Sequence, residues 1–405
     1  MFAIATKLFS WLNTRLPIVN TFERHLSKHP VPSKVNFWYL FGALASVVLI
    51  IQIVSGIWLI MPYSNTEDEA FSSIEYIMRD VDYGWLIRYI HTTGASMFFA
   101  VVYLHMFRGL LYGSYQKPRE LVWIFGCTIY LVMMAEGFLG YVLPYGQMSY
   151  WGAQVIISLF GAIPYIGESL ELWVKGDYYI SGITVSRFFA LHVVALPLVL
   201  IALVFLHLVA LHEVGAGNPE GVDIEEHLDD DGVPLDSVPF FPYKILNALV
   251  GIGVFMTVFA VIMFFFPEGG GYFIEMANFQ EANPLVTPDH IAPVWYYAPY
   301  FTMLRAVPDP FGGLIVMAAA VAIFFVVPWL DRSGVASIRY KGIFSKVALI
   351  LFAVSFITLG YLGTVGVTEV RKIVSVICTV IYFAYFLLMP FYTKFEKTKK
   401  VPERL

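Results

Sequence analysis

Eight long apolar stretches, separated by polar or mixed connections, dominate the pattern of hydrophobic and polar positions along the chain. Each is long enough for a helix to cross the hydrocarbon core of a bilayer, which takes roughly 20 residues. The stretches cover approximately 37–61, 85–111, 121–143, 184–211, 244–266, 311–330, 344–363 and 373–392. The pattern therefore predicts an all-α integral membrane protein with eight transmembrane helices and with both termini on the same side.

Composition and charge agree with this class of protein. Of the 405 residues, 59% are hydrophobic and 14% are charged, and the mean hydropathy is +0.71, whereas soluble proteins average roughly 45–50% and roughly 25%. The net charge of −5 and the lack of a basic stripe argue against a nucleic-acid partner. Under the predicted topology 18 of the 25 Lys and Arg residues fall on the side of the termini. The positive-inside rule therefore predicts that both termini are cytoplasmic.

Four histidines lie in two pairs inside the apolar stretches: His91 with His105 in the second, and His192 with His207 in the fourth. An ionisable side chain at bilayer depth is costly and usually functional, and neutral imidazole is a common ligand for iron. On a helix, the step from His91 to His105 spans about 21 Å and four turns less about 40°, so both rings leave one face. The longer step from His192 to His207 overshoots four turns by about 60°. Facing helices of this kind predict two stacked bis-histidine haems inside a bundle of the first four spans.

Four glycines repeat nearly the same period. Gly42 and Gly56 in the first span, and Gly126 and Gly140 in the third, follow the same step as the first histidine pair. Because glycine has no Cβ, the backbone there can approach a flat macrocycle, although small residues also pack membrane helices together. The topology places Gly56 and Gly140 at the depth of the outer histidines, and Gly42 and Gly126 at the depth of the inner ones. Pro197 should kink the fourth span, and the bend could absorb its extra residue.

Two arginines and two cysteines limit how a haem could be held. Arg88 and Arg187 precede the first histidine of each pair by three and five residues, and are predicted to bind haem propionates. Snorkelling is the commoner reason for an arginine at a helix end. Cys127 and Cys378 lie in apolar spans and the chain has no C-x-x-C-H sequence, so a haem must be held without thioether bonds.

Two outer connections, 144–183 and 267–310, are long and rich in aromatic, apolar and proline residues. Irregular backbone at membrane depth is tolerated only where it is buried or lines a cavity. We therefore expect the two connections to cap a lipid-accessible pocket for a quinone beside the outer haem. An interfacial belt of aromatic residues would give the same composition.

The chain divides into five parts on this pattern. The inner connection carries the acidic run Asp229–Asp231 and is predicted to be a solvated linker. The first residues lack the apolar core and cleavage site of a secretory signal, and are predicted to lie on the membrane surface. The parts are a surface segment (1–33), a haem-bearing bundle (34–212), an acidic linker (213–243), four further transmembrane helices (244–392) and a basic tail (393–405).

Several short strings in the sequence are specific enough to point to a protein family. They read DYGWLIRYIH (82–91), GASMFF (94–99), GYVLP (140–144), AIPYIG (162–167), RFFALH (187–192) and LHE (211–213). From about Pro32 to Pro390 the chain resembles cytochrome b, the quinol-oxidising core subunit of the cytochrome bc complexes. The unbroken chain of eight spans favours the respiratory type over the photosynthetic one, which is split into two polypeptides.

The resemblance implies that the four paired histidines are the axial ligands of two non-covalently bound haem b groups. It also implies a quinol-oxidation site on the outer side, near Tyr141, Gly152 and the motif formed by Pro293, Val294, Trp295 and Tyr296, and it places His212 at a quinone-reduction site on the inner side. The expected partners are a Rieske iron–sulfur protein, a cytochrome c1-type subunit, quinone, membrane lipid and a second copy of the complex. The expected location is a bacterial inner membrane.

The chain departs from the family pattern at both quinone sites. The family's outer motif is Pro-Glu-Trp-Tyr, whereas this chain has valine in place of glutamate at position 294. Valine cannot accept a quinol proton, so another group must relay it, and Asp289 and His290 are the predicted candidates. At the inner site the family's Lys-Asp pair aligns with Asn247 and Ala248, and Lys244 lies one turn away.

These observations predict quinol oxidation and transmembrane electron transfer through two b-type haems, coupled to proton translocation. One alternative is a haem-b membrane anchor of a dehydrogenase that only passes electrons to quinone. Such a protein would not need the aromatic outer cap or four further helices. The other alternative is a transporter in which the histidines form a proton relay. It would have no visible chromophore, and it would leave the glycine spacing unexplained.

Overall fold

The computed structural model describes residues 2–17, 19, 22–23 and 27–405. Within this part of the chain eight helices are long and apolar enough to cross a membrane. They are Phe37–Ile60, Gly84–Tyr112, Glu120–Val142, Gly182–Val214, Phe240–Phe265, Pro310–Leu330, Ile343–Thr364 and Glu369–Leu387. All eight predicted spans are thus confirmed, with ends that differ by a few residues.

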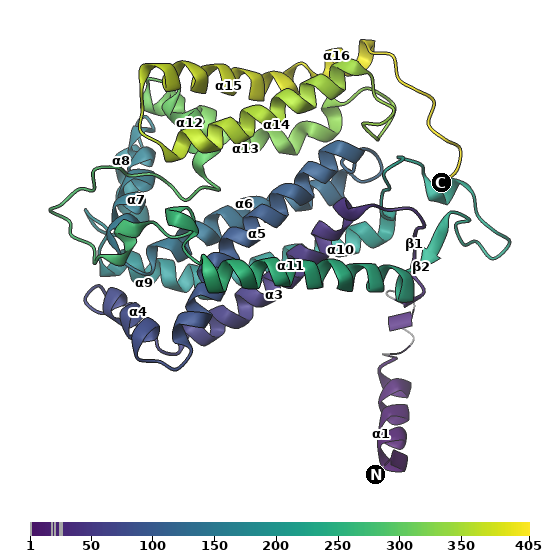
Figure 1. Cartoon of the computed structure of the whole chain (residues 1–405), viewed down its shortest axis with the longest axis horizontal. Helices are drawn as coiled ribbons and strands as arrows, with labels where there is room; N and C mark the ends of the chain where they lie inside the picture. The colour runs from purple at the N-terminus through teal and green to yellow at the C-terminus, as the bar shows by residue number, and fades with distance from the viewer. Residues whose placement is uncertain (1, 18, 20–21, 24–26) are drawn as a thin grey trace.

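The first four spans lie together as a bundle (Figure 1). Their elements are η2 (Phe37–Tyr39) with α3 (Leu40–Ile60), α5 (Gly84–Tyr112), α6 (Glu120–Val142), and α9 (Gly182–Ala190) with η4 (Leu191–Ala195) and α10 (Leu196–Val214). Helix α3 packs along α5, and α10 packs along α6. The helices are apolar on nearly all sides, as expected where lipid and protein both surround them. The bundle brings the two histidine-bearing helices, α5 and α10, into one unit.

The fourth span contains a π-helical turn at its first histidine. Element η4 has i→i+5 hydrogen bonds, includes His192, and leads into α10, whose first turn contains Pro197. A π-turn takes up one more residue than an α-turn, and proline lacks the N–H that an α-helix would use. The turn therefore absorbs the extra residue between His192 and His207, close to the bend that the sequence predicts.

The remaining spans form two groups rather than one. Helix α11 (Ile245–Phe265), preceded by η6 (Phe240–Lys244), packs against α3 and α5, although its place in the sequence grouped it with the C-terminal helices. The others form a second layer in yellow and green (Figure 1): α12 (Ala298–Arg305), α13 (Pro310–Leu330), α14 (Ile343–Thr364), α15 (Glu369–Leu387) and α16 (Met389–Phe395). Buried rings of Phe352, Tyr382 and Phe386 fill this layer. Trp123 joins the layers by donating its Nε1–H to the Phe324 carbonyl at 2.7 Å.

The two long outer connections fold against each other. They contain α7 (Gln147–Ser158), η3 (Leu159–Ala162), α8 (Gly167–Lys175), η7 (Gly269–Gly271) and η8 (Met276–Phe279), and the short outer helix α4 (Ala70–Arg79) lies nearby. The Gln147 N–H donates to the Gln280 carbonyl at 2.9 Å, and the Ala282 N–H to the Tyr145 carbonyl at 3.1 Å. The Gln147 side chain bridges two backbone groups of the second connection, at Asn283 and Val286. The cap is therefore a packed structure and not a set of free loops.

The end of the bundle that is predicted to lie on the inner side is closed by a small sheet and by the C-terminal tail. Strand β1 (Pro30–Pro32) pairs antiparallel with β2 (Ser237–Pro239), after the short turn η5 (Ile224–Glu226). Arg404 donates two hydrogen bonds of 3.1 Å to the Asp236 carboxylate, and these bonds lower the pKa of Asp236. The predicted basic tail is thus anchored to the connection 213–243. The run Asp229–Asp231 is exposed, as predicted.

Helix α1 (Phe2–Arg15) projects away from the bundle (Figure 1). Its described side chains are largely exposed and include Phe9, Trp11 and Leu12. The predicted surface segment 1–33 falls partly outside the described residues, at 1, 18, 20–21 and 24–26. Its position on a membrane surface stays a prediction.

Candidate functional site

The four paired histidines meet across the bundle as two facing pairs. The ring centres of His91 and His192 are 6.2 Å apart, with ring planes at 89°. Those of His105 and His207 are 6.4 Å apart, with planes at 65°. Two metal–imidazole bonds of about 2 Å, plus the distance from each nitrogen to its ring centre, come to roughly 6.3 Å. Each pair is therefore spaced to hold one six-coordinate iron, and the residues fit a bis-histidine haem.

The protein fixes the tautomers of the outer pair. The Ser55 hydroxyl donates to the Ile51 carbonyl at 2.7 Å, so its oxygen accepts from Nδ1–H of His91 at 3.0 Å. Nδ1 of His192 donates to the Glu136 carbonyl at 2.9 Å, and a carboxylate oxygen of Glu136 is 3.1 Å from the same nitrogen. With its proton on Nδ1, each ring has a lone pair on Nε2 for a metal. Partners of this kind orient histidine ligands and raise their basicity.

The four glycines lie against the four histidine rings. A Cβ added at Gly42 would be 3.1 Å from Cε1 of the His105 ring, and one added at Gly56 equally close to that of His91. The corresponding distance for Gly126 and the His207 ring is 3.4 Å. Gly140 makes the closest approach of the four, because a Cβ there would be 2.9 Å from Nε2 of His192 and closer still to Cε1 of the same ring. The pairing in depth follows the sequence prediction, but the missing Cβ makes room for the imidazole itself.

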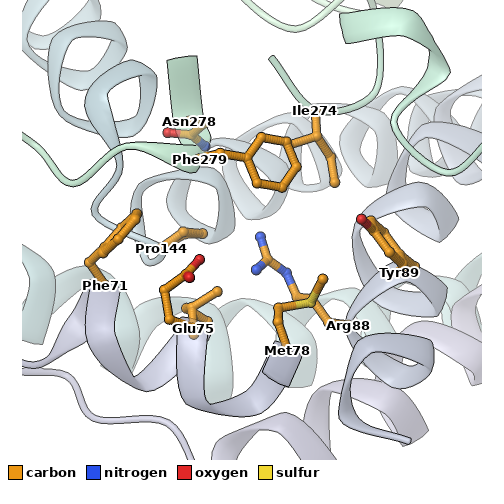
Figure 2. A pocket seen from close by; sticks show the side chains of 10 residues that line it. Phe71, Glu75, Met78, Arg88, Tyr89, Pro144, Ile274, Asn278 and Phe279 are labelled. Atoms are coloured by element: carbon orange, nitrogen blue, oxygen red, sulfur yellow. The ribbon is translucent and has the colours of Figure 1, made fainter. Parts of the chain in front are cut away.

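Arg88 is a buried cation at the outer pair. The residue is only 9% exposed, and its side chain makes no hydrogen bond or ion pair with the described residues. Nearby Glu75 is paired with Arg79 at 2.5 Å. Figure 2 shows the guanidinium pointing into a cavity between Glu75 and Tyr89. The cavity has a volume of about 30 Å³, enough for one or two waters. An unpaired buried cation is costly, so this position fits an anionic group such as a haem propionate.

The second predicted arginine is placed differently. Arg187 is exposed, and its guanidinium donates to the Trp173 carbonyl at 2.8 Å. This placement gives no support to a propionate role. Arg108, which the sequence analysis did not single out, lies at the inner pair. Its Nη2 is 3.5 Å from Nδ1 of His105, its guanidinium stacks over the Tyr39 ring at 4.8 Å, and its Nε has no partner. The sequence does contain a signal for Arg108. It follows His105 by three residues, the same number by which Arg88 precedes His91.

The outer cap gathers the residues expected at the quinol site. The Gly152 backbone lies against the Tyr141 ring, because a Cβ added to it would be 3.7 Å from Cε1 of the tyrosine. Tyr296 is buried and stacks on Phe99 with ring centres 3.8 Å apart, and Trp295 donates to the Ser96 hydroxyl at 3.2 Å. Pro293 and Val294 precede them, with Val294 packed in the apolar core. The motif and Tyr141 thus belong to one connected region under the cap.

The two predicted proton relays lie outside this region. Asp289 and His290 are both exposed, and neither makes a side-chain hydrogen bond or ion pair with the described part of the chain. A different carboxyl group contacts the region: Tyr141 donates to Glu275 at 2.7 Å. Burial raises the pKa of Glu275 to about 7, against the lowering effect of the Tyr141 hydrogen bond. The sequence analysis did not identify Glu275, because it lies far from both the motif and Tyr141 along the chain.

On the inner side, His212 lies near the end of α10 and is exposed. Its Nδ1 is 2.8 Å from the Leu208 carbonyl, and its ring centre is 4.6 Å from that of His29. The segment after His29 forms β1, and Lys244 donates to the Ser33 carbonyl at 3.0 Å. The segment 29–33 therefore links His212 to Lys244, and His29 is a neighbour that sequence reasoning missed.

Fold and site together define a class of protein: a multi-pass, mostly helical membrane protein with two histidine pairs, each spaced for one haem iron. Comparison with known proteins identifies the family. The family description "Cytochrome b/b6/petB" matches residues 26–215, and "Cytochrome b(C-terminal)/b6/petD" matches residues 281–383. The chain belongs to the cytochrome b family and is of the bc1 type.

Similar proteins span the whole chain. Cytochrome b of Allochromatium vinosum is 55% identical over 413 residues, covering 100% of both chains. Cytochrome b of Rhodospirillum rubrum is 45% identical over 397 residues, covering 98% of this chain and 95% of that one. A chain of a solved structure titled "Hyperthermophilic respiratory Complex III" aligns with a TM-score of 0.89 and 36% identity, over 96% of this chain and 99% of that chain. Haem b binding, a membrane location and a role in respiratory electron transfer follow from the family.

Proposed function

We propose that this chain is the core subunit of a quinol–cytochrome c reductase. In this role it oxidises quinol at the outer side and carries electrons across the membrane between two haem b sites, coupled to proton translocation. The observation that carries the proposal is the spacing of the two histidine pairs, 6.2 Å and 6.4 Å between ring centres, in one bundle. Two iron sites at different depths are what a path across a membrane requires.

Each part of the bundle has a role in holding the cofactors. His91 and His192 would hold the outer haem, and His105 and His207 the inner one, through the Nε2 atoms. Arg88 would pair with a propionate of the outer haem, because its buried charge needs an anion. When bound, each haem supplies one-electron redox chemistry, whose potential the protein tunes through ligands, hydrogen bonds and burial.

The outer cap is proposed to bind quinol beside the outer histidine pair. Tyr141, Gly152 and the motif 293–296 would line the site, with aromatic surface for the quinol ring and tail. Oxidation of one quinol releases two electrons and two protons. Resemblance implies that one electron goes to the Rieske iron–sulfur protein and on to the cytochrome c1-type subunit. The other electron crosses the bundle to the inner side. Moving it against the membrane field costs about 2.3 kcal/mol per 100 mV.

The inner side is proposed to reduce quinone near His212. The His29 ring lies against the His212 ring, and the linkage through β1 brings Lys244 to the same face. These groups can supply protons where the family's Lys-Asp pair is replaced by Asn247 and Ala248. We further propose that the chain works as a dimer of the complex in a bacterial inner membrane, with both termini cytoplasmic.

A spectrum and a redox titration of membranes carrying the chain test the haem sites. Two b-type components with different midpoint potentials are expected in the reduced-minus-oxidised spectrum. His91→Ala should remove the outer component and His105→Ala the inner one, while Asp289→Asn, on the exposed loop, should remove neither. A single component, or a colourless protein, would contradict the proposal and favour the haem anchor or the proton transporter respectively.

A further inference from the structure

The outer site contains a carboxyl group that the motif does not supply. Glu275 lies between η7 and η8, and its carboxylate accepts a hydrogen bond of 2.7 Å from the Tyr141 hydroxyl. Val294, at the position where the family has glutamate, is 4% exposed and packed in the apolar core. We propose that Glu275 is the proton acceptor for quinol in this chain, in place of the carboxylate missing at position 294. The inference rests on the proposed quinol oxidation.

The backbone around Glu275 is fixed in place by the cap. Three residues on, Asn278 accepts a hydrogen bond of 2.9 Å from the Ser149 N–H through its side-chain oxygen. Gly146 leaves room for Asn278, since an added Cβ would be 2.6 Å from the Asn278 backbone oxygen and closer still to its side-chain oxygen. Ser149 in turn donates to the Tyr141 carbonyl at 2.6 Å. The same network therefore positions both the tyrosine and the segment that carries the carboxyl group.

The environment of Glu275 suits a base that works near neutral pH. Burial raises the pKa of its carboxyl group from the ordinary 4.5 to about 7, while the Tyr141 hydrogen bond opposes the shift. A general base is most effective when its pKa is close to the operating pH. Tyr296, in the motif, has a pKa raised by burial and then by the charge of Glu275, which puts the carboxyl group near the motif. Charged or titratable groups on neighbouring elements line the adjacent cavity with Ile274: Arg88 and Tyr89 of α5, and Glu75 of α4. Tyr89 in turn donates to the Glu268 carboxylate at 2.9 Å.

The proton transfer balances with the oxidation. As quinol becomes quinone, its two hydroxyl O–H bonds break and both electron pairs remain on the organic molecule, which gives up two electrons in single steps. The two electrons would go to the iron–sulfur partner and to the haem that His91 and His192 would hold. One proton bonds to a carboxylate oxygen of Glu275, and the other leaves to water at the outer surface. Glu275 then releases its proton to the same water and is again a carboxylate.

The variant Glu275→Gln separates a purely structural role of Glu275 from a role as proton acceptor. In Glu275→Gln the side-chain carbonyl can still accept the Tyr141 hydrogen bond, but the amide cannot take up a proton at these pH values. Shape and hydrogen bonding are thus kept, and only the proton acceptor is lost. Glu281→Gln, on the same connection and with an exposed side chain, makes the same chemical change away from Tyr141 and serves as the matched control.

The experiment uses the whole complex in membranes. Quinol-dependent reduction of cytochrome c is measured between about pH 6 and pH 8, around the pKa of Glu275, together with the spectra and midpoint potentials of both haems. In the unsubstituted protein the rate should rise with pH as Glu275 loses its proton. Glu275→Gln should lower the rate by about tenfold or more and remove this rise, with both haem spectra unchanged and Glu281→Gln like the unsubstituted protein. Val294→Glu in the Glu275→Gln background should restore part of the rate.

The outcomes separate this inference from the proposed function. If Glu275→Gln keeps the unsubstituted rate and pH profile, with both haems present, Glu275 is not the proton acceptor and the inference is overturned. If the unsubstituted complex contains both haems but does not oxidise quinol, the proposed function fails first.

Discussion

The glycines opposite the histidines predict a graded response to one added methyl group. In Gly140→Ala the new Cβ would lie 2.9 Å from Nε2 and 3.0 Å from Nδ1 of His192. The Cε1 atom of the ring would be closer still. Ordinary contacts between such atoms are about 3.5–4.0 Å, so the ring must retreat by roughly 1 Å or more. In Gly126→Ala the Cβ would be 3.4 Å from the His207 ring, which needs almost no movement.

The two substitutions should therefore have very different consequences. Nδ1 of His192 is held by the Glu136 carbonyl at 2.9 Å, so the ring cannot retreat without losing this bond or the bond of about 2 Å that its Nε2 would make to a haem iron. Overpacking of this kind costs about 1–3 kcal/mol. At Gly126 the steric cost is small, and alanine gains up to about 1 kcal/mol in helix propensity. Gly140→Ala should lose most of the outer haem, whereas Gly126→Ala should keep the inner haem and the free energy of unfolding nearly unchanged.

Two quantities are measured. They are the haem content per polypeptide, from the reduced-minus-oxidised spectrum, and the midpoint potential of each component. Gly42→Ala and Gly56→Ala, where the added Cβ would be 3.1 Å from the ring, should fall between the two extremes. The reasoning is refuted if Gly126→Ala and Gly140→Ala lose the same amount of haem, or if Gly140→Ala affects the inner component instead of the outer one.

Three further substitutions, with Arg187→Gln as a control, test the charges and hydrogen bonds around the outer site. Arg88→Gln should lower the midpoint potential of the outer haem and weaken its retention, because a buried cation favours the reduced form, while Arg187→Gln should change neither in the same titration. Glu136→Gln replaces the carboxylate that is 3.1 Å from Nδ1 of His192. It should raise the midpoint potential of the outer haem, by up to about 59 mV for a tenfold change in equilibrium constant. A lower potential would contradict this. Tyr141→Phe removes a hydrogen bond that lowers the pKa of Glu275, so the rate of quinol oxidation should begin its rise at higher pH, and a shift to lower pH would refute the assignment.

The features that the sequence predicted are those set by local periodicity. Membrane spans follow from apolar stretches of sufficient length, and the shared face of His91 and His105 follows from the helical repeat. The depth pairing of glycines with histidines needed only the order of the spans and their alternating direction. The sequence could not say that each glycine faces an imidazole and not the macrocycle edge, because this depends on how closely α3 and α6 approach the histidine-bearing helices.

Features set by side-chain direction were less predictable. Arg88 and Arg187 have similar places relative to a histidine, yet one is buried toward the bundle and the other bonds to the Trp173 carbonyl at the surface. Trp173 lies in α8 of the outer cap, so the direction of the Arg187 side chain depends on tertiary packing that helix spacing does not fix.

Glu275 could not have been found from the sequence, for a reason that follows from how loops fold. It is 134 residues from Tyr141 along the chain, and it lies in irregular backbone where no period fixes the direction of a side chain. The sequence predicts Asp289 and His290, close to position 294, as replacements for the missing carboxylate, and the structure leaves both exposed. What brings Glu275 to the tyrosine is the packing of one outer connection on the other, through Asn278 and α7. A function carried by a carboxyl group thus depends on tertiary contacts of the cap, so a lost acidic residue in the motif need not mean a lost proton acceptor.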